Sequence, residues 1–233
     1  MYCYCVMPDH VHILLRVKER SKYHLGVYIS QLTGKITNKY NEETHQQISH
    51  TEIFQPNYTD KIIYANRSLD TLFRYIRENP HRLAMRRQYP QFFQRTRNIQ
   101  IGAKPYEAYG NLFLLRNPDK EAVKISRRDS PEIIADKTAR WLDEVSRGTI
   151  LTSPFISSKE KEIRNKAEAQ GAKIILITHK AFPERYKPYD HDFTLCAAGR
   201  LLILSLGLPA KTPLTREICQ QMNSLASEIA KNC

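Results

Sequence analysis

Short apolar, β-branched runs alternate with longer amphipathic stretches from about residue 113 to the end of the chain. The runs are typical of buried strands, and the stretches have the three-to-four-residue apolar spacing of helices. The predicted elements are strands over 122–126, 149–156, 173–178 and 201–206, and helices over 131–146, 159–170 and 213–230. Strands that alternate with helices favour a parallel sheet. We therefore predict a Rossmann-like parallel α/β domain over residues 113–233.

Local helix signals support this pattern. Ser130-Pro131 supplies an N-cap followed by proline at the first helical position. Ser157 and Glu160 form a capping box at the next helix. Gly148 and Gly171 stand where C-terminal caps belong.

The N-terminal part contains the run Met7–Leu15, with sequence MPDHVHILL. Side chains alternate across a strand, so His10 and His12 are expected on the same face. Two imidazoles at this spacing are a partial ligand set for a divalent metal. The alternative is that both histidines only form local hydrogen bonds.

Residues 1–97 also predict two helices and short strands. Apolar residues recur at helical spacing over 22–40 and again over 68–79. Residues 52–55 are predicted as a short strand, and residues 61–64 as a strand or a loop. This mixture predicts an α+β domain. Glycines and a proline in 98–112 predict a linker between the two domains.

Tyr75 and Asn79 lie four residues apart in the second predicted helix and therefore share one face. Tyr75 offers a hydroxyl, and Asn79 offers a carbonyl oxygen suited to a hard cation. The alternatives are a packed aromatic at Tyr75 and a helix end at Asn79, because the residue before a proline avoids the α region.

The region around this helix is strongly basic. Seven arginines and one acidic residue lie between Arg74 and Arg97, with Tyr89, Phe92 and Phe93 among them. Arginine forks and aromatic rings suit the phosphates and bases of a single strand. The candidate DNA-binding residues are Lys35, Lys39, Arg74, Arg77, Arg82, Arg86 and Arg87. A solvated basic face is the alternative.

The whole chain of 233 residues has a net charge of +12, which favours a polyanionic partner. Its five cysteines are odd in number and form no disulfide framework. We see no transmembrane run and no signal peptide, so we expect a cytoplasmic protein with no membrane partner.

The run from Met7, followed some sixty residues later by YIRENP at Tyr75–Pro80, resembles the HUH single-tyrosine transposases, especially the REP-associated transposases of bacteria. The resemblance implies a ferredoxin-like antiparallel sheet with helices over residues 1–97. It implies His10, His12 and Asn79 as ligands for Mg²⁺ or Mn²⁺, and Tyr75 as the nucleophile.

The activity implied by this family is single-strand DNA cleavage and strand transfer through a 5′-phosphotyrosine. The implied substrate is single-stranded or hairpin DNA, and family members often form homodimers. These transposases normally carry a strand and a helix before the HUH strand. This chain begins close to that strand, so the resemblance implies a domain without its usual first strand and helix.

The C-terminal part is weakly similar to DNA-processing protein A and to lysine-decarboxylase-like Rossmann folds, in which strand ends bind phosphate. The candidate phosphate-binding residues are Arg127, Arg128, Ser157, Lys187 and Arg200. The usual glycine before the Ser-Arg pair is absent, and there is no Gly-x-Gly-x-x-Gly or Walker motif. A structural or DNA-gripping domain without chemistry is the alternative, and Cys196 reads as a core residue.

These observations predict a metal-dependent DNA endonuclease and strand transferase. Two alternatives stay open. One is a DNA-binding protein without catalysis, and the other is a nucleotide-binding enzyme centred on the C-terminal domain.

Overall fold

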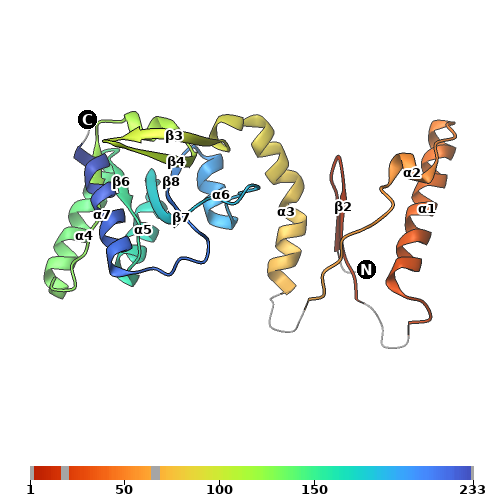
Figure 1. Cartoon of the computed structure of the whole chain (residues 1–233), viewed down its shortest axis with the longest axis horizontal. Coiled ribbons are helices and arrows are strands. Elements are labelled where there is room, and N and C mark those ends of the chain that lie inside the picture. Colours follow the sequence, from red (N-terminus) through yellow and green to blue (C-terminus); the bar gives the residue numbers. More distant parts are fainter. Residues whose placement is uncertain (1–2, 17–20, 64–68, 232–233) are drawn as a thin grey trace. The chain divides into compact units, whose positions relative to one another are not determined.

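The computed structural model describes residues 3–16, 21–63 and 69–231. The chain divides into two compact units, Met1–Arg82 and Leu83–Cys233, which we call unit 1 and unit 2. Both combine helices with strands, so the predicted mixed α/β class is confirmed (Figure 1). No helix in the described ranges is long and apolar enough to cross a membrane.

Unit 1 contains an antiparallel hairpin of β1 (Cys3–Val6) and β2 (Val11–Leu14). Its register pairs Cys5 with His12, so the two strands hold the histidine segment at the end of a tight turn. The helices of this unit are α1 (Leu25–Thr44), α2 (His50–Ile53) and the first part of α3 (Leu69–Gln88). Of the ferredoxin-like sheet that we expected, the described residues form this one hairpin.

Two local predictions in unit 1 are wrong. Residues 52–55 were expected as a strand, but Ser49 and Glu52 form a capping box that starts the short helix α2. The second predicted helix was expected to end before Pro80, yet α3 continues through it to Gln88. Residues 61–63 are irregular, and Tyr64 and Ser68 lie outside the described residues.

Unit 2 is built on a six-stranded sheet with the order β3-β4-β8-β7-β6-β5. The four strands β5 to β8 are parallel, as predicted, and β3 and β4 add an antiparallel edge. The strands are β3 (Arg95–Ile101), β4 (Lys104–Gly110), β5 (Lys120–Ala122), β6 (Ile150–Ser153), β7 (Ile174–Lys180) and β8 (Leu201–Leu208). The helices are α4 (Pro131–Ser146), α5 (Ser158–Ala169), α6 (Asp190–Ala197) and α7 (Arg216–Lys231), with 3₁₀ turns η1 (Pro90–Phe92) and η2 (Leu112–Arg116).

The predicted linker over 98–112 is instead the hairpin β3–β4 and the start of η2. The glycines that suggested a linker have structural tasks. Gly102 makes the hairpin turn with φ +57°, and Gly110 lies so close to β8 that a Cβ there would be 2.4 Å from the Leu201 carbonyl oxygen. The chain therefore passes into unit 2 at Leu83, before the predicted boundary at residue 97.

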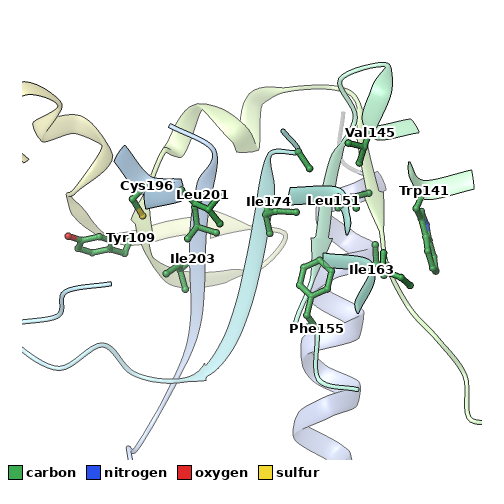
Figure 2. Close-up of a cluster of buried hydrophobic side chains, with 14 of the residues drawn as sticks. Tyr109, Trp141, Val145, Leu151, Phe155, Ile163, Ile174, Cys196, Leu201 and Ile203 are labelled. Carbon is green, nitrogen blue, oxygen red and sulfur yellow. The ribbon is translucent and has the colours of Figure 1, made fainter. Parts of the chain in front are cut away.

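Alternate residues of the central strands fill two cores. Leu201 and Ile203 pack on the face covered by α4, α5 and α6, whereas Leu202 and Leu204 pack on the face covered by α7. Figure 2 shows the first core, in which Trp141 and Cys196 lie with the strand residues. Because both faces are buried, the strands read as continuous apolar runs in the sequence.

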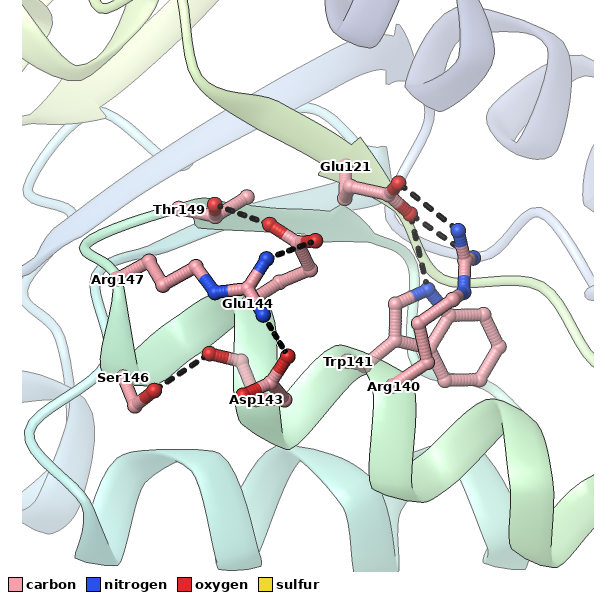
Figure 3. Close-up of polar contacts among 8 residues, drawn as sticks. All are labelled: Glu121, Arg140, Trp141, Asp143, Glu144, Ser146, Arg147 and Thr149. Atoms are coloured by element: carbon pink, nitrogen blue, oxygen red, sulfur yellow. Dashed lines mark hydrogen bonds and ion pairs between the residues drawn. The ribbon is translucent and has the colours of Figure 1, made fainter.

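Polar contacts fasten α4 to the sheet (Figure 3). The Glu121 carboxylate of β5 accepts two 3.1 Å hydrogen bonds from Arg140 and one from the Trp141 indole N–H. Glu144 accepts a hydrogen bond from the Thr149 hydroxyl at the start of the next strand. These contacts hold the short edge strand β5 in place.

Candidate active site

The two histidines of the N-terminal motif face each other. His10 ends the turn between β1 and β2, and His12 lies in β2 two residues later. Their Nε2 atoms are 3.0 Å apart, and their ring centroids are 4.6 Å apart. Strand alternation thus places both ring nitrogens toward one point, as the sequence predicted.

Tyr75 of α3 reaches the same place. Its ring centroid is 5.8 Å from that of His12, in an edge-to-face arrangement. Tyr75 is 43% exposed, so part of this residue is accessible to solvent. A partly exposed tyrosine beside two imidazoles is a good arrangement for attack on a phosphate that a metal holds.

Asn79 lies one helical turn after Tyr75 and is 8% exposed. Its Nδ2 atom is buried and has no hydrogen-bond partner among the described residues. A buried N–H donor without a partner is unfavourable. Asn79 and Tyr75 share one face of α3, because they are four residues apart.

The donor set can hold a divalent cation. Two Nε2 atoms 3.0 Å apart have the spacing of neighbouring ligands on one ion. Clusters of three or more His, Cys, Asp or Glu side chains that could bind a metal do not occur in the described ranges.

The predicted DNA-binding side chains differ in exposure. The exposed ones include Lys35, Arg74, Arg77 and Arg87, whereas Arg86 is partly buried. Arg82 is buried, and its guanidinium group lies 2.9 Å from Glu78. Lys39 is exposed but lies 3.5 Å from Glu42, which offsets its charge.

The predicted phosphate-binding residues of unit 2 do not gather at one end of the sheet. Arg127, Arg128, Ser157 and Lys187 follow the carboxyl ends of β5, β6 and β7. Arg200 precedes the amino end of β8, where it donates a hydrogen bond to the Glu168 carbonyl oxygen. Because these strands are parallel, Arg200 belongs to the opposite end.

The start of α5 is already filled by an anion of the protein itself. The Glu160 carboxylate accepts hydrogen bonds from the backbone N–H groups of Ile125, Ile156 and Ser157 at 3.0–3.2 Å. These amides would otherwise be free for a phosphate group. In addition, β5 to β8 lie in chain order with α4, α5 and α6 on one face, so the parallel strands lack the reversal of order at which nucleotides bind.

Sequence reasoning assigned no task to Asp9. In the structure its Oδ1 atom lies 2.7 Å from His10 Nδ1, the ring nitrogen that faces away from His12. The signal that could have identified it is its position directly before the first histidine of the pair.

A family model matches the N-terminal part of the chain. Residues 1–79 match the family described as Transposase IS200 like. The matched segment includes His10, His12, Tyr75 and Asn79, and it lies within unit 1. It accounts for 79 of the 233 residues, so it concerns the N-terminal part of the chain.

One solved structure has a weak likeness to the chain. The X-ray structure of DNA processing protein A from Streptococcus pneumoniae covers 87% of this chain and 74% of its own, at 16% identity and a TM-score of 0.43. The weak similarity noted in the sequence is thus matched by a weak structural one, which carries no argument about function. No curated protein matches the chain.

Proposed function

We propose that unit 1 is a metal-dependent single-strand DNA endonuclease and strand transferase that forms a 5′-phosphotyrosine intermediate. The observation that carries this proposal is the position of the Tyr75 ring, 5.8 Å from the His12 ring and beside the facing Nε2 atoms. The match of residues 1–79 to Transposase IS200 like supports the same reaction.

Tyr75 is the proposed nucleophile. Its phenolic oxygen forms a bond to the scissile phosphorus while the bond from phosphorus to the 3′ oxygen breaks. The phenolic proton is released to solvent, and the leaving 3′ oxygen takes up a proton to give a free 3′-hydroxyl. In strand transfer a 3′-hydroxyl attacks the phosphotyrosine, and the phenol is regenerated.

His10 and His12, with Asn79, are the proposed metal ligands. A bound Mg²⁺ or Mn²⁺ ion supplies Lewis-acid polarisation of the scissile phosphate. The hairpin fixes the two imidazoles, and α3 fixes Tyr75 relative to them. The task of the protein is thus to present the phenolic oxygen beside the bound phosphate in a fixed orientation.

The proposed substrate is single-stranded or hairpin DNA. The exposed cations Arg74, Arg77 and Lys35 are suited to its phosphates, and an open, flexible strand can bend so that one phosphate reaches Tyr75. Arg82 is left out of the proposed contact set, since it is buried against Glu78.

The test is a denaturing gel of the protein incubated with 5′-labelled and 3′-labelled hairpin DNA, with Mn²⁺, Mg²⁺ or EDTA. We expect a covalent protein–DNA band that requires metal and that Tyr75→Phe abolishes. DNA binding by this variant should stay within about twofold of wild type, because the phenylalanine ring keeps the packing against His12. Tyr40→Phe is the matched control, since Tyr40 is 42% exposed on α1, and it should cleave like wild type.

A band that survives in Tyr75→Phe would reject Tyr75 as the nucleophile. Tight DNA binding with no band on any hairpin, in wild type and variants alike, would favour the alternative of a DNA-binding protein without catalysis. In that case the contacts of the exposed cations would be the function of unit 1.

A further inference from the structure

The Asp9 carboxylate contacts one of the two ring nitrogens of His10 and so determines that this nitrogen carries a proton. Asp9 Oδ1 is 2.7 Å from His10 Nδ1, and His10 Nε2 is 3.0 Å from His12 Nε2. A carboxylate can only accept a hydrogen bond, so the Nδ1 atom of His10 must donate. A histidine that binds a metal is neutral and carries one N–H, so with the proton on Nδ1 the Nε2 atom of His10 presents its lone pair.

The second nitrogen of His10 points toward the other histidine. His10 Nε2 lies 3.0 Å from His12 Nε2, so a lone pair on His10 Nε2 is directed to the place where the two rings converge.

We infer that Asp9 is a positioning residue that holds His10 in its metal-binding tautomer. The inference rests on the proposed function, because it assigns Asp9 a task in the same site. A carboxylate that accepts the second N–H of a ligating histidine fixes the tautomer and the orientation of the ring. Asp9 and His10 are adjacent in the chain and lie in the turn after β1, so their contact is local.

A long-range charge effect would also make Asp9 favour a cation, and the two causes can be separated. Asp9→Asn removes the charge but keeps an oxygen that accepts from His10 Nδ1. Asp9→Ala removes both. Positioning predicts that the asparagine variant behaves like wild type, whereas a charge effect predicts that both variants are equally weakened.

The first measurement is the affinity of the full chain for Mn²⁺, read from the electron paramagnetic resonance signal of the free ion. We expect Asp9→Ala to bind about 10–100-fold more weakly than wild type, and Asp9→Asn to stay within about threefold. Glu43→Ala is the control, because it removes an exposed carboxylate from α1 of the same unit. Equal weakening of both Asp9 variants, or no weakening in Asp9→Ala, overturns the inference.

The second measurement needs no metal. The ¹⁵N chemical shifts of the His10 ring at pH 8 report which nitrogen carries the proton. We expect Nδ1–H in wild type and in Asp9→Asn, and loss of this preference in Asp9→Ala. An unchanged tautomer in Asp9→Ala would overturn the inference.

The two measurements keep this inference separate from the proposed function. If His10→Ala with His12→Ala abolishes Mn²⁺ binding while Asp9→Ala does not weaken it, the inference fails and the metal site stands. If wild type binds no Mn²⁺ but the tautomer depends on Asp9, the positioning contact stands and the metal-dependent function fails.

Discussion

Folding raises the pKa of three acidic side chains in unit 2. Burial, and then the nearby Asp192 charge, raises the pKa of the Cys196 thiol to about 12. Burial also raises the pKa of Tyr109 to about 12, with Cys196 as the next cause, and raises the pKa of Tyr186 above its ordinary value. The thiol of Cys196 is therefore neutral near pH 7, which agrees with its prediction as a core residue.

These shifts predict that unit 2 loses stability in alkali. Each group holds its proton more tightly in the folded state, so the folded chain carries more protons than the unfolded chain between about pH 9 and pH 12. The contribution of these three groups to the free energy of unfolding is therefore fully present below their ordinary pKa values and is lost as the pH rises through the raised ones. Urea unfolding at pH 7, 9 and 10.5 measures it.

Cys196→Ala tests which group causes the first part of this loss. Between pH 9 and 10 the thiol contributes before the tyrosines, since the ordinary pKa of a cysteine is 9.0 and that of a tyrosine is 10.0. The variant should have a flatter pH dependence in this range, although it is less stable at every pH. The same slope in both proteins would contradict the assigned cause.

Single residues were predictable from sequence where strand or helix periodicity alone sets their direction. His10 and His12 face each other because they are two residues apart in an extended segment. Arg82 and Arg200 were not predictable, since their contacts depend on burial and on which end of the sheet they occupy. Composition shows a basic stretch, but it does not show which cations already contact the protein.

At the scale of elements, α3 and the hairpin β3–β4 differ most from expectation. Pro80 cannot donate a backbone hydrogen bond, yet α3 continues to Gln88, so this local preference does not end the helix. Helix α1 formed as predicted, but its apolar residues Tyr28, Leu32, Ile36 and Tyr40 stay 37–42% exposed. Periodicity predicts a helix and its apolar face, but it does not predict how deeply that face is buried.

The Glu160 carboxylate connects the loops after β5 and β6 at the start of α5, and its contribution to stability can be tested. Glu160 is 5% exposed, and its carboxylate satisfies three backbone N–H groups from the loops after β5 and β6. Glu160→Ala leaves these donors without partners and should reduce the free energy of unfolding of unit 2 by about 2–4 kcal/mol. Urea unfolding followed by Trp141 fluorescence reports this unit.

Glu162→Ala is the matched control on the same helix. Glu162 lies on the surface between Lys159 and Lys166, so its removal should change stability little. A similar loss in both variants would mean that helix charge, rather than the buried carboxylate, stabilises the junction.

At the scale of the whole molecule, the two units differ in how much core they contain. Unit 2 has two extensive apolar cores on either side of a six-stranded sheet. The sheet of unit 1 has two strands in the described residues, and Tyr4 and Val6 of that hairpin are more than half exposed. Two-stranded sheets are marginally stable in water, so unit 1 should unfold more easily.

Calorimetry of the full chain should therefore give two transitions, with unit 1 unfolding at the lower temperature. Leu151→Ala empties a fully buried position in unit 2, which costs about 2–5 kcal/mol and should move only the upper transition, by about 5–15 °C. Ile36→Ala changes a side chain that is 42% exposed on α1 and should leave the upper transition in place. One transition that moves as a whole in Leu151→Ala would show instead that the two units unfold as a single cooperative body.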